Sequence, residues 1–321
     1  MRLYSVIIPV YNRPDEVDEL LESLTRQTYN HFEVLVVEDG SSKRCDGIVE
    51  KYTNKLRLTY FYKPNSGQGF SRNFGFEKAK GDFLVVFDSD CIIPDHYFET
   101  VEKYLDKHQL DAYGGPDRAH DSFTPTQKAI SYSMTSVFTT GGIRGGKKRV
   151  GAFHPRSFNM GISKEVYQKT KGYKITRMGE DIEFSIRIIE LGFKTGLIED
   201  AYVYHKRRTS LSQFYKQLHF FGRARINISR FYPDEIKLVH MLPVVFTLGF
   251  FLMWVLPVVS PVLFFIAFTV FISFFGLIFF DAFAKEKSLQ VAALSVGAAF
   301  TQLFAYGVGF LTEGWRKLVK G

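Results

Sequence analysis

The chain has 321 residues, which suffices for one large domain or two of ordinary size. Its formal net charge of +8 predicts a surface that attracts anions such as phosphates or acidic lipid headgroups. Its two cysteines, Cys45 and Cys91, give neither a metal-binding spacing nor a disulfide framework, and they suit a reducing compartment.

The N-terminal two thirds show the pattern of a soluble α/β domain. The chain runs directly into SVIIPV, without the basic and long apolar regions of a signal peptide, so we expect none. Short apolar runs that suit buried strands of a parallel sheet lie at residues 5–10, 34–37, 58–62 and 83–87. After the first run, Val17, Leu20, Leu21 and Leu24 recur at helical spacing, and Pro14 suits a first helical position. Alternating strands and helices predict a doubly wound, mostly parallel, Rossmann-like sheet.

Acidic side chains follow two of these strands, at the edge where open parallel sheets bind ligands. Glu38 and Asp39 come after the second strand, and FDSD places Asp88 and Asp90 after the fourth. Residues two apart in an extended chain point to the same side, and neighbouring carboxylates repel unless a cation lies between them. We therefore predict a site for Mg²⁺ or Mn²⁺, which would in turn hold a phosphorylated ligand. A helix cap or a turn is the alternative role for any single one of these acids.

The last third of the chain is strongly apolar. Between Lys237 and Asp281 there is no charged residue, an interval roughly twice what one bilayer crossing needs. Ser260-Pro261 divides this interval, and a third uncharged run follows that is rich in small residues, which let helices pack closely in lipid. We expect two to three hydrophobic helices, at about 239–259, 261–280 and 288–312. Buried helices of a soluble protein are the alternative, but these need a polar face.

Four segments resemble, in the same order, the family 2 glycosyltransferases of the GT-A fold. They are SVIIPVYNRPDEVDELLESLTRQTY, VLVVEDGSS, GFSRNFGFEKAKGDFLVVFDSD and MGEDIEFSIRIIELGF. The resemblance implies a catalytic domain at 1–230, with a nucleotide-sugar half at about 1–116 and an acceptor half at about 117–230, before a membrane region at 231–321. It also implies inverting transfer of a sugar from a nucleotide-diphosphate donor, most often a UDP-sugar, with Mg²⁺ or Mn²⁺ as the cofactor.

The resemblance assigns roles to single positions. The donor would be bound by Pro9, Tyr11, Glu38, Asp39, Arg72, Asn73, Asp88 and Ser89. The metal would be bound by Asp90 and Asp88, and by His205, for which a structural role is the alternative. Asp181 matches the catalytic base, which an acceptor hydroxyl needs because it is a poor nucleophile at neutral pH. A first-turn acid favoured by the helix dipole is the alternative for Asp181.

Contacts to the acceptor or to the diphosphate are expected from the second half of this domain. The residues are Glu180, Asn159, Arg207, Arg208, Gln217 and Arg223. Processive synthases of the family carry Gln-x-x-Arg-Trp, whereas LHFFGRAR follows Gln217 without a tryptophan, which argues against such a synthase. The run GGIRGGKK at 141–148 lacks the hydroxyl residue and the preceding strand of a phosphate loop, and we interpret it as a basic loop that closes over the acceptor.

We therefore expect a membrane enzyme whose acceptor is linked to a lipid. The segment GGPDRAHDSFTPTQKAISYSMTSVFTTGG resembles bacterial enzymes that build exopolysaccharide repeat units. This favours a lipid-linked oligosaccharide as acceptor over a polyprenyl phosphate, the acceptor of dolichol-phosphate-mannose-like synthases. A sugar nucleotidyltransferase would need a glycine-rich basic loop where this chain has PVYNRP, and a binding module without activity would leave three carboxylates repelling one another in one cleft. We expect no nucleic acid partner.

We expect an integral membrane protein with the catalytic domain on the cytoplasmic face, of the inner membrane if the protein is bacterial. Nucleotide sugars and reduced cysteines belong on that side, and the basic cluster from Lys206 to Arg230 precedes the first hydrophobic helix, as the positive-inside rule requires. The first two helices would then form a hairpin that returns to the cytoplasm. If the third run spans the membrane, the tail EGWRKLVKG lies outside, and if it is re-entrant or interfacial, the tail stays inside. The sequence leaves both arrangements open.

Overall fold

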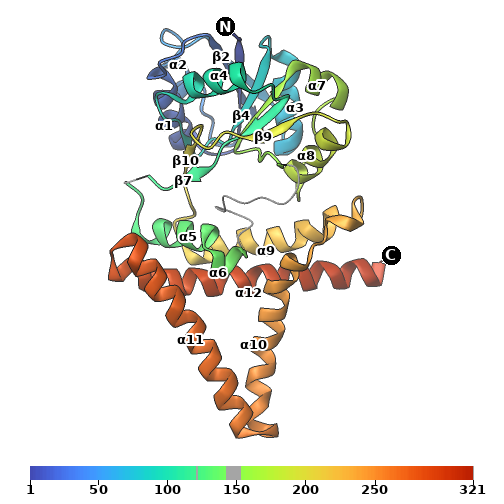
Figure 1. The fold of residues 1–321 in the computed structure, drawn as a ribbon. Helices are drawn as coiled ribbons and strands as arrows, with labels where there is room; N and C mark the ends of the chain where they lie inside the picture. The colour runs from blue at the N-terminus through green and yellow to red at the C-terminus, as the bar shows by residue number, and fades with distance from the viewer. Residues whose placement is uncertain (121, 142–152, 321) are drawn as a thin grey trace. The chain divides into compact units, whose positions relative to one another are not determined.

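The computed structural model describes residues 1–120, 122–141 and 153–320, and the chain divides into two compact units (Figure 1). The first unit consists of residues 1–120 and 149–206, and the second of residues 121–148 and 207–321. The predicted boundary at residue 230 differs from this division. Residues 121–148 and 207–230 were expected in the catalytic domain but belong to the unit that contains the hydrophobic helices. Their Ala129 and Phe214 lie in one apolar cluster with Ala298 and Ala305.

The first unit is built on a seven-stranded sheet in the order β3-β2-β1-β4-β8-β6-β9. Its strands are β1 (Tyr4–Val10), β2 (Phe32–Asp39), β3 (Leu58–Lys63), β4 (Phe83–Phe87), β6 (Ala112–Gly114), β8 (Asn159–Ser163) and β9 (Thr195–Leu197). β8 pairs antiparallel with β4 and β6, and the other neighbouring strands pair in parallel. The predicted mostly parallel sheet is confirmed, and the apolar run 83–87 coincides with β4.

Shorter elements complete this unit. A three-stranded sheet in the order β5-β10-β7 consists of β5 (Cys91–Ile92), β10 (Val203–His205) and β7 (Asp117–Arg118). The helices are α1 (Pro14–Thr25), α2 (Asp46–Glu50), α3 (Gln68–Lys78), α4 (Tyr97–Lys107), α7 (Lys164–Thr170) and α8 (Glu180–Glu190).

Both faces of the large sheet are buried. Val6 and Ile8 of β1 pack in a cluster with side chains of α1 and α4, whereas Ile7 packs in a second cluster with side chains of α3, α7 and α8. Successive residues of a strand point to opposite faces, so a strand covered on both faces needs apolar residues at every position. This double coverage explains the continuous apolar runs.

The described part of the second unit is helical. It contains α5 (Pro125–Thr135), α6 (Val137–Thr140), α9 (Leu211–Ile228), α10 (Leu242–Val259), α11 (Pro261–Glu286), α12 (Leu289–Lys320) and short 3-10 helices at Pro233–Glu235 and Leu238–Met241. Three helical segments are long and apolar enough to cross a membrane: Leu238–Val259, Pro261–Glu286 and Leu289–Val319. The three predicted hydrophobic helices are thereby confirmed. The second and third helices continue beyond their predicted ends at 280 and 312, to Glu286 and Lys320. The prediction ended them before the first charged residues, but these residues also adopt helical conformation.

Candidate active site

The loops that follow β1, β2 and β4 meet at one edge of the large sheet, as expected for the carboxyl ends of parallel strands. After β1, the N–H of Asn12 donates to Ser41 Oγ at 2.9 Å, and Asn12 Oδ1 accepts from the N–H of Lys43 at 2.9 Å. The next residue, Arg13, reaches the loop after β4, where its Nη1 lies 2.5 Å from Asp90 Oδ2. The β1 loop is therefore tied to both neighbouring loops.

Asp39 ends β2 and holds the loop after β3. Its carboxylate accepts hydrogen bonds from the N–H groups of Ser66 at 2.8 Å and Gly67 at 2.9 Å, and from Lys63. Burial would raise the pKa of Asp39, but these donors hold it below its usual value. Asp39 is therefore an ionised group that fixes this loop, and its contact with a nucleoside stays a prediction.

Glu38 lies inside the fold, with no exposed surface. Its Oε2 accepts hydrogen bonds from the Tyr60 hydroxyl at 2.6 Å and from the N–H of Cys45 at 2.9 Å. Its Oε1 has no hydrogen-bond partner among the described residues. Glu38 thus links β2 to β3 and to the start of α2, and its predicted contact with a donor stays a prediction.

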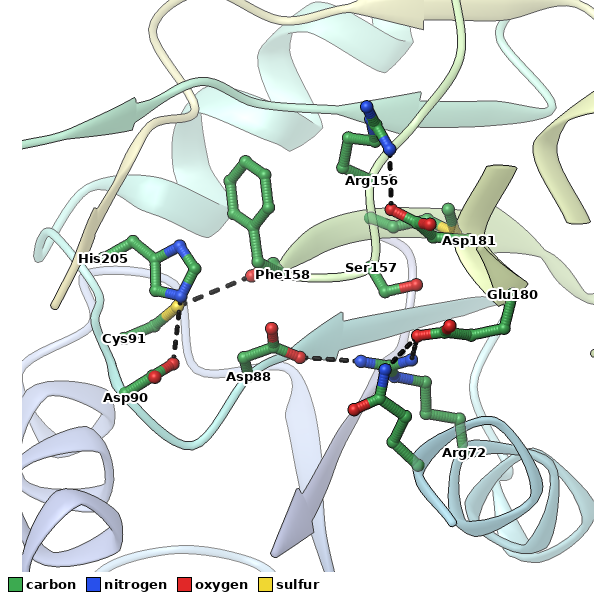
Figure 2. Close-up of polar contacts among 12 residues, drawn as sticks. Arg72, Asp88, Asp90, Cys91, Arg156, Ser157, Phe158, Glu180, Asp181 and His205 are labelled. Atoms are coloured by element: carbon green, nitrogen blue, oxygen red, sulfur yellow. Dashed lines mark hydrogen bonds and ion pairs between the residues drawn. The ribbon is translucent and has the colours of Figure 1, made fainter. Parts of the chain in front are cut away.

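The chain between β4 and β5 forms a turn, closed by the N–H of Cys91, which donates to the Asp88 carbonyl at 3.1 Å. The prediction that Asp88 and Asp90 point to the same side of an extended segment is wrong, because this turn directs their side chains apart. Figure 2 shows Asp88 pointing toward Arg72 and Asp90 toward His205. The structure therefore does not bring Asp88 into the cluster that surrounds Asp90.

Arg72 is a buried cation that links Asp88 to Glu180. Its Nη2 donates to Asp88 at 2.8 Å and its Nη1 to Glu180 at 3.3 Å, and Glu180 also accepts a hydrogen bond from Gln68. Burial would lower the pKa of Arg72, but Asp88, Tyr173 and Glu180 raise it above its usual value. Burial also raises the pKa of Glu180. Arg72 and Glu180 form an internal ion-pair network, and the donor contact predicted for Arg72 and the acceptor or diphosphate contact predicted for Glu180 stay predictions.

Asp90 belongs to a compact group of possible metal ligands. Ligand atoms of Asp90, Cys91 and His205 lie within 4.8 Å of one another, and His205 Nε2 lies 3.0 Å from Asp90 Oδ1. The Phe158 ring stacks on the His205 ring, with centroids 5.1 Å apart, which fixes the imidazole. Burial would lower the pKa of Arg13, but Asp90 raises it, so the Arg13 guanidinium stays charged beside this carboxylate.

Asp181 lies in the first turn of α8 and is partly exposed. Arg156 Nη1 donates to its Oδ2 at 3.0 Å, and the N–H of Ile182 donates to its Oδ1 at 2.9 Å. Burial would raise the pKa of Asp181, but Arg156, Arg72 and the Ile182 amide hold it below its usual value. Asp181 is therefore an ionised carboxylate with an accessible surface, in contrast to the buried Glu180.

Two asparagines predicted at the donor or acceptor have structural partners. Asn73 uses both ends of its amide on the backbone of Tyr173, donating to the carbonyl and accepting from the N–H at 2.8 Å each. Asn159 is completely buried, donates to the Ala201 carbonyl at 2.8 Å and accepts from the Tyr97 hydroxyl at 2.5 Å. The acceptor contact predicted for Asn159 is wrong, because this side chain has no exposed surface and both of its polar ends are bonded.

Three other predicted donor residues lie at the same sheet edge. Pro9 is in β1 and is partly exposed, and Tyr11 follows this strand with 53% of its surface exposed. Ser89 is buried within the turn between β4 and β5. Their predicted contacts with a nucleotide sugar stay predictions.

Four residues expected at the acceptor or diphosphate belong to the second unit: Arg207, Arg208, Gln217 and Arg223. Arg223 Nε donates to Glu313 at 3.0 Å, so the Arg223 charge is paired with a carboxylate in the contact between α9 and α12. Arg207 is buried, and its carbonyl accepts a hydrogen bond from Gln127 at 3.0 Å. Apart from Gly141, which ends α6, the glycine-rich run 141–148 lies outside the described residues.

The sequence did not predict three residues that shape this site: Arg13, Arg156 and Phe158. Arg13 had a local signal, because it directly follows the first strand, where ligand-binding loops begin. Arg156 and Phe158 had none, because each gains its role from a partner far away in the chain, Asp181 and His205 respectively.

The comparisons with known proteins agree with this fold. Residues 5–170, more than half of the chain, match the profile of Glycosyl transferase family 2. The chain therefore belongs to glycosyl transferase family 2. A mannosyltransferase from Pyrobaculum calidifontis, solved with GDP-Man and Mn²⁺, is similar in structure, with a TM-score of 0.60, 18% identity and coverage of 98% of this chain and 88% of that chain. At this identity the similarity concerns the fold, and it confirms the predicted GT-A architecture.

Two relatives show how far the sequence similarity extends. The poly(ribitol-phosphate) beta-N-acetylglucosaminyltransferase TarS of Staphylococcus aureus is 37% identical over 115 residues, which is 35% of this chain and 20% of that protein. An uncharacterized glycosyltransferase of Haemophilus influenzae is 29% identical over 222 residues, 65% of this chain and 71% of that protein. The chain thus matches about a fifth of the length of TarS.

Proposed function

We propose that this protein transfers a sugar, with inversion at the anomeric carbon, from a nucleotide-diphosphate donor to a hydroxyl of a membrane-linked acceptor. The observation that carries the proposal is the separation of two acidic groups at the ligand-binding edge of the sheet. Asp90 lies with His205, while Asp181 lies beyond the Asp88–Arg72–Glu180 network (Figure 2). Inverting transfer requires this separation, because the base acts on one face of the sugar and the diphosphate leaves from the other.

Asp90 and His205 are suited to hold a divalent cation. A carboxylate oxygen is a ligand that Mg²⁺ and Mn²⁺ prefer, and such sites leave positions open for diphosphate oxygens. Cys91 lies within reach of the same position, but a thiol suits softer metals. When bound, such an ion would neutralise the charge that the leaving diphosphate gains.

Asp181 is the group that accepts the proton of the acceptor hydroxyl. Its lowered pKa keeps it ionised at neutral pH, and Arg156 holds its carboxylate in one orientation through Oδ2. Glu180 does not fit this role, because it is buried and bonded to Arg72 and Gln68. The base therefore deprotonates the hydroxyl as its oxygen bonds to the anomeric carbon and the bond to the diphosphate breaks.

The hydrophobic helices support an acceptor that is itself anchored in the membrane. A lipid-linked oligosaccharide of a cell-surface polysaccharide is the class that we favour, and the name of the S. aureus relative, which acts on poly(ribitol-phosphate), supports a cell-surface polymer. A polyprenyl phosphate is the second class, favoured by the same helices. We propose a UDP-sugar as donor, as is most frequent among family 2 enzymes, and a catalytic unit on the cytoplasmic side.

A panel assay on the purified full-length chain in lipid nanodiscs tests this proposal. Several UDP- and GDP-sugars are offered with Mn²⁺ or EDTA, together with either a polyprenyl phosphate or a polyprenyl-diphosphate oligosaccharide. We expect release of nucleoside diphosphate and metal-dependent extension of the oligosaccharide, seen by mass spectrometry. Formation of a polyprenyl-phosphate sugar would select the second acceptor class. Tight donor binding without any transfer, under all of these conditions, would contradict an enzymatic role.

A further inference from the structure

Helix α12 is apolar and long enough to span a membrane, but its neighbours in the second unit differ from those of a spanning helix. Half of its most apolar window is buried, compared with 17% for α10 and 11% for α11. Its partners include the polar helix α9 as well as the two hairpin helices. The question is whether α12 crosses the bilayer beside the hairpin or lies across its open end.

The hairpin helices contact α12 with their open ends. At the start of α10, Thr247 Oγ1 donates to the Phe304 carbonyl at 3.5 Å. At the end of α11, Ile278 and Ala282 pack in one cluster with Ala292 and Ala299 of α12. The turn of the hairpin, at Ser260, lies at the opposite ends of α10 and α11. Figure 1 shows α12 lying across the open end of the hairpin rather than along it.

Helix α9 runs alongside α12 in the same direction. Leu211 lies beside Gly297 at one end of the contact. At the other end, Lys317 Nζ donates to Ser229 Oγ at 3.2 Å. In the middle of the contact the backbones approach closely, because a Cβ at Gly222 would lie 2.1 Å from the Tyr306 carbonyl oxygen. The two helices are therefore neighbours over about five turns, at 3.6 residues per turn.

This side-by-side contact excludes a spanning orientation of α12 as long as the contact is kept. α9 carries Lys216, Arg223 and Arg225, and Glu313 of α12 pairs with Arg223 at 3.0 Å and Arg230 at 3.3 Å. If α12 crossed the bilayer, α9 would be carried to the same depth with these charges. Charged side chains at the centre of a bilayer are strongly unfavourable. A helix pair that lies flat keeps all of them at the water side.

The exposed face of α12 suits the membrane–water interface. Leu311, Trp315, Leu318 and Val319 recur at i, i+4, i+7 and i+8, and the last three are more than 60% exposed. Phe304, which meets the hairpin, continues the same face by helical spacing. An apolar stripe opposite a charged face is typical of helices that lie in the interface plane, where tryptophan is also enriched.

We propose that α12 lies in the plane of the membrane interface with α9 on its water side, and that the α10–α11 hairpin is the part of the described chain that enters the hydrocarbon core. The occupant of the exposed apolar stripe is the lipid bilayer. Both ends of α12 then stay on the side of the membrane where residues 1–237 lie. This inference does not rest on the proposed transfer reaction.

Cysteine labelling of the full-length chain in intact cells tests the inference. In a background with Cys45→Ala and Cys91→Ala, single cysteines are placed at three exposed positions: Lys55→Cys, Gln290→Cys and Arg316→Cys. Lys55 reports the first unit, and Gln290 and Arg316 report the two ends of α12. We expect all three to be protected from a membrane-impermeant maleimide and to be labelled after the membrane is permeabilised.

Labelling of Arg316→Cys in intact cells, while Gln290→Cys stays protected, would overturn the inference, because the two ends of α12 would then lie on opposite sides. Lys320→Cys, at the last residue of α12, provides a second position at the same end, should Arg316→Cys fail to accumulate. Protection of both C-terminal positions, together with Gln290→Cys, supports the flat helix. Labelling of both C-terminal positions while Gln290→Cys stays protected shows a spanning helix.

Discussion

Replacement of Asp181 by asparagine tests the assignment of the catalytic base. Asn and Asp have the same shape, so the side-chain oxygen can still accept the hydrogen bond that Arg156 Nη1 donates to Asp181 Oδ2 at 3.0 Å. The amide cannot accept a proton from the acceptor. We therefore expect intact folding, unchanged donor affinity and a loss of transfer.

The size of the loss follows from the electrostatics of this carboxylate. General-base catalysis contributes about 10²- to 10⁴-fold, and a base of low pKa lies toward the lower end. Because Arg156 and Arg72 hold the pKa of Asp181 below its usual value, we expect a loss of about 10²-fold, or about 2.7 kcal/mol of transition-state stabilisation. The assay measures kcat and KM for the donor, together with the dissociation constant of UDP.

The pH profile provides a second readout. The wild-type rate is expected to be level at neutral pH and to fall in acid as Asp181 is protonated. Arg156→Met removes the main cation that lowers this pKa, so the acid limb is expected to move to higher pH. In Asp181→Asn this limb is expected to be absent.

Glu180→Gln is the matched control, because Glu180 is the neighbouring acid but is buried and bonded to Arg72. We expect this variant to lose stability rather than the acid limb of the rate profile. If Glu180→Gln abolishes transfer while Asp181→Asn retains it, Glu180 is the base and the reasoning is refuted. An equal loss of UDP affinity and of rate in Asp181→Asn would indicate a donor-binding or structural role instead.

Three further predictions concern other parts of the chain. Asp90→Ala is expected to abolish Mn²⁺ binding and metal-dependent transfer, whereas Cys91→Ala is expected to keep both, because a hard cation does not need the thiol. Titration with Mn²⁺, followed by electron paramagnetic resonance, measures the binding, and retained binding in Asp90→Ala would contradict the assignment. The pKa of Asp39 in the folded state lies below its usual value of 3.8, so the ionised carboxylate stabilises the fold fully above 3.8, and this stabilisation is lost as the pH falls through the lowered pKa. In urea titrations we expect wild type to be more stable than Asp39→Asn at pH 7 and the difference to close in acid, and a difference independent of pH would refute this. Glu313→Ala leaves Arg223 of α9 and Arg230, just after that helix, without their carboxylate, and we expect it to lower the free energy of unfolding by about 1–3 kcal/mol in denaturation followed by tryptophan fluorescence. Arg316→Ala, which removes an exposed partner at 3.6 Å, is expected to change little, and equal effects of the two variants would argue against the ion pairs of Glu313 with Arg223 and Arg230.

Much of the fold is visible in the sequence because its signals are local. The run 83–87 coincides with β4, and Pro14 begins α1, because an apolar run and the fixed φ of a proline are properties of the local sequence. The order of the motifs identifies the family, and the uncharged interval after Lys237 identifies the hydrophobic hairpin. These features depend on which residues are close in the chain.

Within the site, the sequence located the right strand ends but not the directions of the side chains. Asp88 and Asp90 were expected together, but a turn closed by the Cys91 N–H separates them. The internal hydrogen bonds of Asn159 likewise could not be expected, because its partner Ala201 lies on a distant segment. A side-chain direction depends on a few backbone torsions and on long-range neighbours, which residue spacing does not specify.

The tertiary structure alone decided how the long-range partners combine. His205 meets Asp90 and Arg156 meets Asp181 because β10 and the segment before β8 are placed at the same sheet edge by strand pairing. The character of α12 is a similar case. By length and composition it could cross a membrane, and only its contact with the charged helix α9 points to a place in the interface. Burial beside a polar partner is a property of the folded chain and not of the segment.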